Sequence, residues 1–334
     1  MNASHQHYLD GWRGLAIILL FWGHFVPVPG INLGTVGVNL FFVLSGLLMA
    51  RLLFVREVPL PEFYKRRISR IVPAFAVYIA LVTAWQMATR QPVVLMDVLP
   101  ALTFTKNYFM EYNTQMPLGH IWSLSVEEHS YILLSLLAVL ARRNLLTPSR
   151  GVALCLGAMA AAGLAYHFLY DGREMGFRMA HSDFAAFGIF ASAMMVLYFN
   201  NKVTPVLNPL VFTVLFTFAV LLHWWSVPVL LRSMGAFAAL ALALHILQSS
   251  AGLAQRLLAC YPLRQLGLWS YSLYLWQQPF YMHVHAGRMS ALAGMTLGLL
   301  CGIASFYLVE QPCRRYLNRR WSSAAPSPAL LPSR

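Results

Sequence analysis

The chain has few charged residues for its length. Only 10% of its 334 residues are Asp, Glu, Lys or Arg, whereas 59% are apolar. A soluble domain carries charge on roughly a quarter of its residues, so these charges are too few to cover a surface that faces water. The shortage argues against an ordinary soluble fold and indicates a membrane protein.

Cysteine is also scarce. The four cysteines show no C-x-x-C spacing, and none falls in a loop expected on the outer side of the membrane: Cys155, Cys260, Cys301 and Cys313. The sequence therefore predicts neither a disulfide framework nor a metal site. We also expect no permanently bound cofactor.

Long apolar runs recur along the whole chain. A transmembrane helix needs roughly 20 apolar residues, because its backbone groups must be hydrogen-bonded within the segment. We find about ten such runs, centred near 11–27, 34–53, 72–89, 120–141, 151–170, 182–199, 209–225, 228–248, 266–285 and 289–309. The prediction is an all-α, polytopic membrane domain over residues 1–321, followed by a disordered tail over 322–334 that is rich in Ser, Ala and Pro.

The net charge of +13 is unevenly divided between alternate loops. Of the 24 Lys and Arg residues, 17 fall on one side of the expected spans and 5 on the other, with Arg13 and Arg232 inside or at the ends of spans. The positive-inside rule then places both termini in the cytoplasm. The basic charge is explained by orientation in the membrane, so no nucleic-acid partner is predicted.

The first span carries three ionisable residues. Such groups cost several kcal/mol at membrane depth unless they are paired or hydrated, which makes them candidates for function. Asp10 and Arg13 are three residues apart and share a helical face. Arg13 and His24 are eleven apart, about three turns, so they also share a face at a separation of roughly 16 Å.

Polar residues on three later spans are expected at the depth of His24. Asn39 lies about one turn into the second span from its outer end. Glu127 and Glu128 lie roughly 10 Å below the outer surface on the fourth span, and Gln277 lies at a similar depth on the ninth. Independent placement would scatter these residues, so a shared polar cavity is predicted.

His24 beside Glu127 would have the chemistry of a general base, because a carboxylate can orient a nearby imidazole and stabilise its charged form. Two alternatives remain. His24 could lie at the outer interface, bonded to lipid headgroups or a backbone carbonyl, and the Glu pair could form a structural ion pair with Arg13 or another helix. We interpret three serines as helix-packing residues: Ser45, Ser123 and Ser125.

A basic cluster follows the second span. Lys65, Arg66, Arg67 and Arg70 occupy about one turn and a half of helix in the segment FYKRRISRIVP. One interpretation is an anchor for anionic lipid that also sets the topology. The predominance of arginine supports a second interpretation, in which the cluster binds a phosphate-rich cytosolic ligand. The planar guanidinium of arginine suits phosphate oxygens.

Six segments occur in one order between residue 8 and about residue 316: LDGWRGLAIILLFWGH, GVNLFFVLSGLLMARLL, FYKRRISRIVPAF, IWSLSVEEHSYILL, LGLWSYSLYLWQQPF and FYLVEQPCRR. In these segments the chain resembles the acyltransferase 3 family of bacterial membrane O-acyltransferases. The resemblance implies ten core membrane helices in the bacterial inner membrane. It also implies transfer of an acyl group, usually acetyl, from cytosolic acyl-coenzyme A to a hydroxyl of a carbohydrate such as a surface polysaccharide or a lipid-linked sugar.

The resemblance also implies roles for particular residues. The catalytic set would be His24, Glu127, Arg13 and Glu128, the donor-binding set Arg66, Arg67, Arg70 and Lys65, and the residues near the acceptor or oxyanion Asn39, Gln277 and Asp10. Many members have His where this chain has Gln277, so His24 is the main candidate base. Some members carry a fused hydrolase-like domain that this chain lacks, so a second step would need a partner, and polysaccharide-assembly proteins are expected partners beside membrane lipids.

Two other classes of function compete with an enzyme. A proton-coupled secondary transporter would also place polar groups at matched depth, but transporters usually show internal repeats and broken helices, and neither is evident in the sequence. A scaffold for polysaccharide export would tolerate substitution of His24 and of the Glu pair. The family resemblance favours the acyltransferase.

Overall fold

The structure, a computed structural model, describes residues 7–110, 116–200, 209–249 and 252–323. Over these residues the regular elements are helices, as the predicted all-α class requires: α1 (His7–Phe25), α2 (Leu33–Ala50), η1 (Arg51–Val55), α3 (Leu60–Ala88), α4 (Leu95–Leu102), η2 (Lys106–Tyr108), α5 (Ile121–Arg142), α6 (Pro148–Leu169), α7 (Gly172–Arg178), α8 (Ser182–Ala185), α9 (Phe187–Phe199), α10 (Pro209–Leu221), η3 (Leu231–Gly235), α11 (Ala236–Ser249), α12 (Leu253–Leu258), α13 (Tyr261–His285), α14 (Ala291–Ser305), η4 (Phe306–Glu310) and α15 (Gln311–Ser323).

Seven helical segments of the described chain are long and apolar enough to cross a membrane: Leu33–Val55, Leu60–Ala88, Ile121–Arg142, Pro148–Leu169, Ser182–Phe199, Leu231–Gln248 and Ala291–Trp321. This composition is that of a multi-pass membrane protein. Each of the ten predicted ranges contains a helix, but the count of ten spans is not confirmed. The other three ranges fall on α1 and α13, which polar residues interrupt, and on α10, whose described part has 13 residues.

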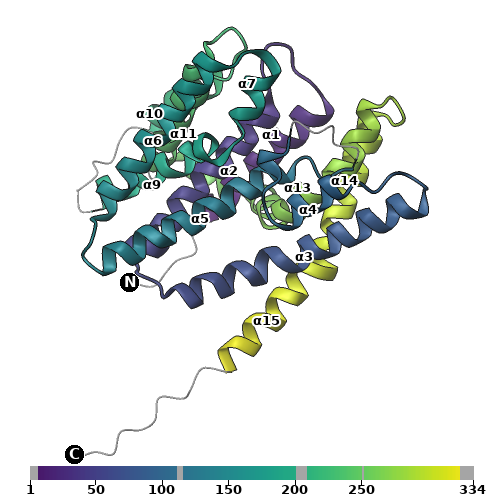
Figure 1. Cartoon of the computed structure of the whole chain (residues 1–334), viewed down its shortest axis with the longest axis horizontal. Coiled ribbons are helices and arrows are strands. Elements are labelled where there is room, and N and C mark those ends of the chain that lie inside the picture. The colour runs from purple at the N-terminus through teal and green to yellow at the C-terminus, as the bar shows by residue number, and fades with distance from the viewer. Residues whose placement is uncertain (1–6, 111–115, 201–208, 250–251, 324–334) are drawn as a thin grey trace, which may run out of the picture.

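The helices pack around α1 and α2. Helix α1 contacts α13, and α13 contacts α14. Helix α1 also contacts α2, and α2 contacts α9. Helices α6 and α11 pack against α9. Helix α3 lies along one side of this bundle and contacts α15, as Figure 1 shows. The predicted last span, 289–309, continues through η4 into α15 as far as Ser323. Of the predicted disordered tail, residues 324–334 lie outside the described residues.

The close approach of α1 and α13 depends on a glycine. A Cβ atom at Gly267 would lie 1.8 Å from the backbone oxygen of Asp10, so no larger residue fits there without moving a helix. Small residues let membrane helices approach in this way. The contact sets the first turns of α1, with Asp10 and Arg13, against the first half of α13.

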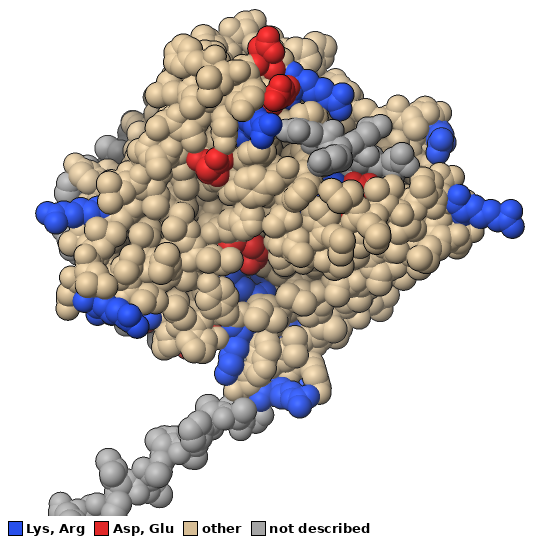
Figure 2. Space-filling model, in the orientation of Figure 1, with Lys and Arg blue, Asp and Glu red and all other residues tan. Residues whose placement is uncertain are grey.

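The outer surface agrees with burial in lipid. Figure 2 shows a face that is largely uncharged, with most of its Lys and Arg toward the margins. Acidic and basic groups meet at one place near the middle of this face. Charged groups in an apolar surface need partners or water.

Candidate active site

A cavity lies among α1, α2, α3, α5 and α13. It holds about 800 Å³ of atom-free space, part of which is open to solvent. Its charged lining residues are Arg13, Arg67, Arg70 and Glu127, which come from three helices far apart in the sequence. Of the five residues predicted to share a polar cavity, only Glu127 lines this one; the lining lacks His24, Asn39, Glu128 and Gln277.

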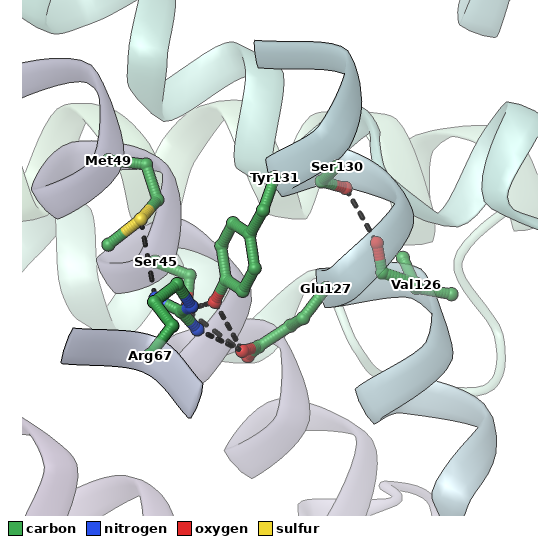
Figure 3. Close-up of polar contacts among 7 residues, drawn as sticks. All are labelled: Ser45, Met49, Arg67, Val126, Glu127, Ser130 and Tyr131. Atoms are coloured by element: carbon green, nitrogen blue, oxygen red, sulfur yellow. Dashed lines mark hydrogen bonds and ion pairs between the residues drawn. The ribbon is translucent and has the colours of Figure 1, made fainter. Parts of the chain in front are cut away.

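Glu127 is the centre of a polar cluster in this cavity (Figure 3). Its carboxylate accepts hydrogen bonds from the Tyr131 hydroxyl at 2.5 Å and from Ser45 Oγ at 3.1 Å. Arg67 Nη2 lies 3.9 Å from Glu127 Oε2, and its guanidinium carbon lies 3.4 Å from the centre of the Tyr131 ring. The same guanidinium reaches Met49 Sδ at 3.3 Å. Arg67 is thus held by a carboxylate, an aromatic face and a thioether.

The basic cluster on α3 divides into two faces. Arg67 and Arg70, three residues apart, share one side of the helix and line the cavity. Lys65 and Arg66 are exposed, and Arg66 forms an ion pair with Glu62 on the same outer side. Of the four residues predicted to bind a phosphate-rich ligand, only two therefore line the cavity.

Arg13 and Asp10 form the ion pair that their spacing predicts, with 2.8 Å between Arg13 Nη1 and Asp10 Oδ1. Because Asp10 offsets part of the charge of Arg13, the cavity can hold this guanidinium beside two others. No carboxylate lies within ion-pair distance of Arg70 in the part of the chain that the structure describes. Three guanidiniums against two carboxylates leave the site with a surplus of positive charge.

His24 lies on the same helix as Arg13, three turns farther along. Its Nδ1 is 2.7 Å from Oε1 of Gln277, whose side chain is fully buried. The amide nitrogen of Gln277 donates to Gln278 Oε1 at 3.4 Å, which leaves Oε1 of Gln277 as an acceptor. Nδ1 of His24 must then donate, so in the neutral imidazole Nε2 carries the lone pair. Gln277 fixes the tautomer that a general base requires.

Gly34 keeps space beside that nitrogen. A Cβ atom at this position would lie 2.9 Å from Cδ2 and 3.1 Å from Nε2 of His24. The other side of the imidazole packs on Tyr281, with 4.7 Å between ring centres. Any larger residue at this position, at the start of α2, would therefore press against the Nε2 edge of His24.

Two expected contacts differ in the structure. The sequence predicts that Glu127 orients His24, whereas the structure pairs His24 with Gln277 and Glu127 with Arg67. Glu127 therefore matches the alternative interpretation of the Glu pair, because it forms an ion pair with a residue of another helix, Arg67 of α3. Asn39, a predicted oxyanion donor, already donates its amide hydrogen to His223 Nε2 at 2.9 Å.

Glu128 does not line the cavity. It follows Glu127 by one residue and so lies about 100° farther round α5. Its Oε1 is buried and has no hydrogen-bond partner among the described residues. The sequence analysis placed both glutamates in one site, but because of this rotation about the helix axis only Glu127 lines the cavity.

Several polar residues of the cavity were absent from the predicted site, among them Ser45, Ser123 and Tyr131. Ser45 and Ser123 were interpreted as packing residues, yet both line the cavity, and Ser45 donates to Glu127. Tyr131 lies four residues after Glu127, a spacing at which side chains on one helix meet, so this signal was present in the sequence.

The geometry so far defines a membrane protein with a cationic cavity and an oriented histidine base. A family model described as an acyltransferase domain matches residues 6–310, nearly the whole chain. The chain therefore belongs to this acyltransferase family. No solved structure matches it.

Three relatives illustrate the similarity. A putative membrane-bound transacylase, BcsY, of Komagataeibacter xylinus is 27% identical over 95% of this chain and 85% of its own length. The peptidoglycan O-acetyltransferase OatA of Listeria monocytogenes is 24% identical over 81% of this chain and 48% of its own length. The O-acetyltransferase OatA of Staphylococcus aureus is 31% identical over 38% of this chain and 24% of its own length. The chain thus matches about a quarter of the staphylococcal protein and about half of the listerial one.

Proposed function

We propose that this protein transfers an acyl group, most simply acetyl, from cytosolic acyl-coenzyme A to a hydroxyl of a carbohydrate at the outer side of the bacterial inner membrane. Family membership and relatives named O-acetyltransferases support the reaction type. The lysine and arginine bias supports an orientation with both termini in the cytoplasm. Helices α1, α10 and α13 would complete ten membrane spans.

The donor would bind along the cavity. Arg67 and Arg70 would hold its phosphates, because a guanidinium fork suits phosphate oxygens. Arg13 and Tyr131 line the same cavity. From Arg13 to His24 the helix rises roughly 16 Å, a span comparable to the pantetheine arm of the donor. The thioester would then reach His24 while the nucleotide stays at the arginines.

His24 would act as the general base for the transfer. Its Nε2 takes the proton of the acceptor hydroxyl, while the hydroxyl oxygen forms a bond to the thioester carbonyl carbon. The carbon–sulfur bond then breaks, and the imidazolium returns the proton to the leaving thiolate. The products are an O-acyl carbohydrate and free coenzyme A.

One observation carries this proposal: His24 presents a lone pair at Nε2, with Nδ1 occupied by Gln277, on the helix that also brings Arg13 into the cationic cavity. The test uses inside-out membrane vesicles from cells with and without the gene, supplied with acetyl-coenzyme A labelled in the acetyl group. We expect label in the glycan fraction only when the protein is present, and mass spectrometry of that glycan would identify the acceptor. Equal labelling in both vesicle preparations would contradict the proposal.

The two faces of the α3 cluster should differ in donor binding. Replacement of Arg67 and Arg70 together by Gln is expected to raise the KM for acetyl-coenzyme A at least about tenfold, because two charge-assisted hydrogen bonds are worth roughly 1.5–3 kcal/mol each. Replacement of Lys65 and Arg66 by Gln removes the same charge from the exposed face of the same helix. That control should leave the KM near its original value. An equal change in KM in both double variants would contradict donor binding by Arg67 and Arg70 and would favour a role of the cluster in topology or lipid binding.

Gly34 should be required for turnover rather than for donor binding. Gly34→Val places methyl groups against Nε2 of His24 and is expected to lower kcat about tenfold or more, since small displacements of reacting groups are costly. Gly157→Val is the matched control, because a Cβ atom at Gly157 in α6 meets nothing within 4 Å. A kcat in Gly34→Val equal to that of the control would show that Nε2 needs no free space.

A further inference from the structure

A second histidine lies beside the cavity. His120 immediately precedes α5 and is only 6% exposed. Its ring lies between two tyrosines, with ring centres 5.6 Å from Tyr78 and 5.0 Å from Tyr274. Helices α3 and α13 thus enclose it on two sides.

Neither ring nitrogen of His120 has a hydrogen-bond partner among the described residues. Buried polar groups are nearly always bonded, and an exception needs an explanation. The buried His223 shows the usual situation, because Asn39 occupies its Nε2 and the backbone oxygen of Ala219 its Nδ1. Burial away from water favours the neutral imidazole. His120 therefore carries one unused N–H donor and one unused lone pair.

His120 is linked to the cavity wall. Its backbone oxygen accepts the hydroxyl of Tyr274, which also bonds Ser123 Oγ at 2.8 Å. Tyr274 and Ser123 both line the cavity. On α13, Tyr274 lies one turn from Gln277, the partner of His24. His120 therefore lies directly behind the part of the cavity wall that Tyr274 and Ser123 form, although it does not itself line the cavity.

The expected oxyanion donors are already engaged. The amide of Asn39 donates to His223, and that of Gln277 donates to Gln278 while its oxygen accepts from His24. Acyl transfer develops negative charge on the carbonyl oxygen, and a hydrogen-bond donor at that position lowers the barrier. His120 is a buried side chain next to the cavity wall, and its ring N–H has no partner among the described residues.

We propose that the N–H of His120 binds the carbonyl oxygen of the acyl thioester and stabilises its negative charge during transfer, an inference that rests on the proposed function. The proton and the leaving group follow the path given above: His24 takes the acceptor proton and returns it to the thiolate. His120 keeps its own proton throughout. The two histidines therefore have different tasks, one as base and one as hydrogen-bond donor.

The test compares three variants in the vesicle assay with labelled acetyl-coenzyme A. His120→Phe keeps an aromatic ring of similar size between the two tyrosines and removes the donor. We expect kcat to fall about 10²- to 10³-fold, as on loss of one oxyanion donor, with an unchanged KM for acetyl-coenzyme A and an unchanged level of protein in the membrane. His120→Gln, which restores an N–H, should recover part of the loss. His245→Phe removes another histidine whose ring nitrogens lack partners in the described chain, away from the cavity lining, and should leave kcat unchanged.

The outcomes separate this inference from the proposed function. If the unmodified protein transfers label and His120→Phe does so at the same rate, His120 is not the donor and the inference fails alone. If His120→Gln is as slow as His120→Phe at equal protein level, the ring has a packing role and the inference also fails. If the unmodified protein transfers no label from acetyl-coenzyme A, the proposed function itself fails.

Discussion

His24→Gln is expected to lower acyl transfer by about two to four orders of magnitude, the contribution of a positioned general base. The amide of glutamine fills similar space but cannot take a proton from the acceptor hydroxyl. Donor binding should persist, because Arg67 and Arg70 line the cavity and His24 does not. The measurement is the initial rate of label transfer together with equilibrium binding of acetyl-coenzyme A.

The matched control for this variant is His283→Gln. His283 lies on α13, where its Nδ1 contacts the backbone oxygen of Pro279 in an exposed position, and it does not line the cavity. Its rate should stay within about twofold of the unmodified protein. A His24→Gln variant that transfers label at the rate of this control would remove His24 from the mechanism.

Glu127→Leu should produce the largest loss of stability. The side chains of Arg67 and Glu127 are 17% and 18% exposed, so the change leaves a largely buried guanidinium without its carboxylate. The hydroxyls of Tyr131 and Ser45 lose their acceptor as well. Loss of one partner of a buried pair costs roughly 3–5 kcal/mol. A lower midpoint of thermal unfolding in detergent would report this effect.

The chain offers two controls for that effect. Glu62→Leu breaks the ion pair with Arg66, whose side chains are 50% and 63% exposed, and exposed pairs are worth roughly 0–1 kcal/mol. Combining Glu127→Leu with Arg67→Met removes both buried charges and should recover much of the stability, though not donor binding. Equal destabilisation by Glu127→Leu and Glu62→Leu would show that the pair in the cavity is effectively solvated.

The sequence predicted the helices and much of the cavity because both depend on periodicity. Apolar runs placed a helix in each of the ten ranges, and the three-residue spacing of Asp10 and Arg13 predicted their ion pair. The same three-residue spacing places Arg67 and Arg70 on one face of α3, which lines the cavity, whereas Arg66 does not line it. Spacing along one helix is local geometry, which the sequence specifies directly.

Partners on different helices were harder to predict. Their expected depth in the membrane would have allowed His24 to contact either Glu127 or Gln277. His24 contacts Gln277 because α1 packs against α13. That packing depends on contacts such as Gly267 against the backbone of Asp10, which no pattern within one helix reveals. Rotation about each helix axis, rather than depth, was the missing information, and it also explains why Glu128 lies outside the cavity.

The most direct measurement is an experimental structure with a non-hydrolysable analogue of acetyl-coenzyme A in which a ketone replaces the thioester. We expect phosphate oxygens within hydrogen-bond distance of Arg67 and Arg70. The carbonyl oxygen of the analogue should lie toward His120, and its carbonyl carbon within about 4–6 Å of His24 Nε2, which leaves room for an acceptor oxygen between them. An analogue bound outside the cavity, or inside it with the carbonyl at the arginines, would contradict a single path from cationic cavity to histidine.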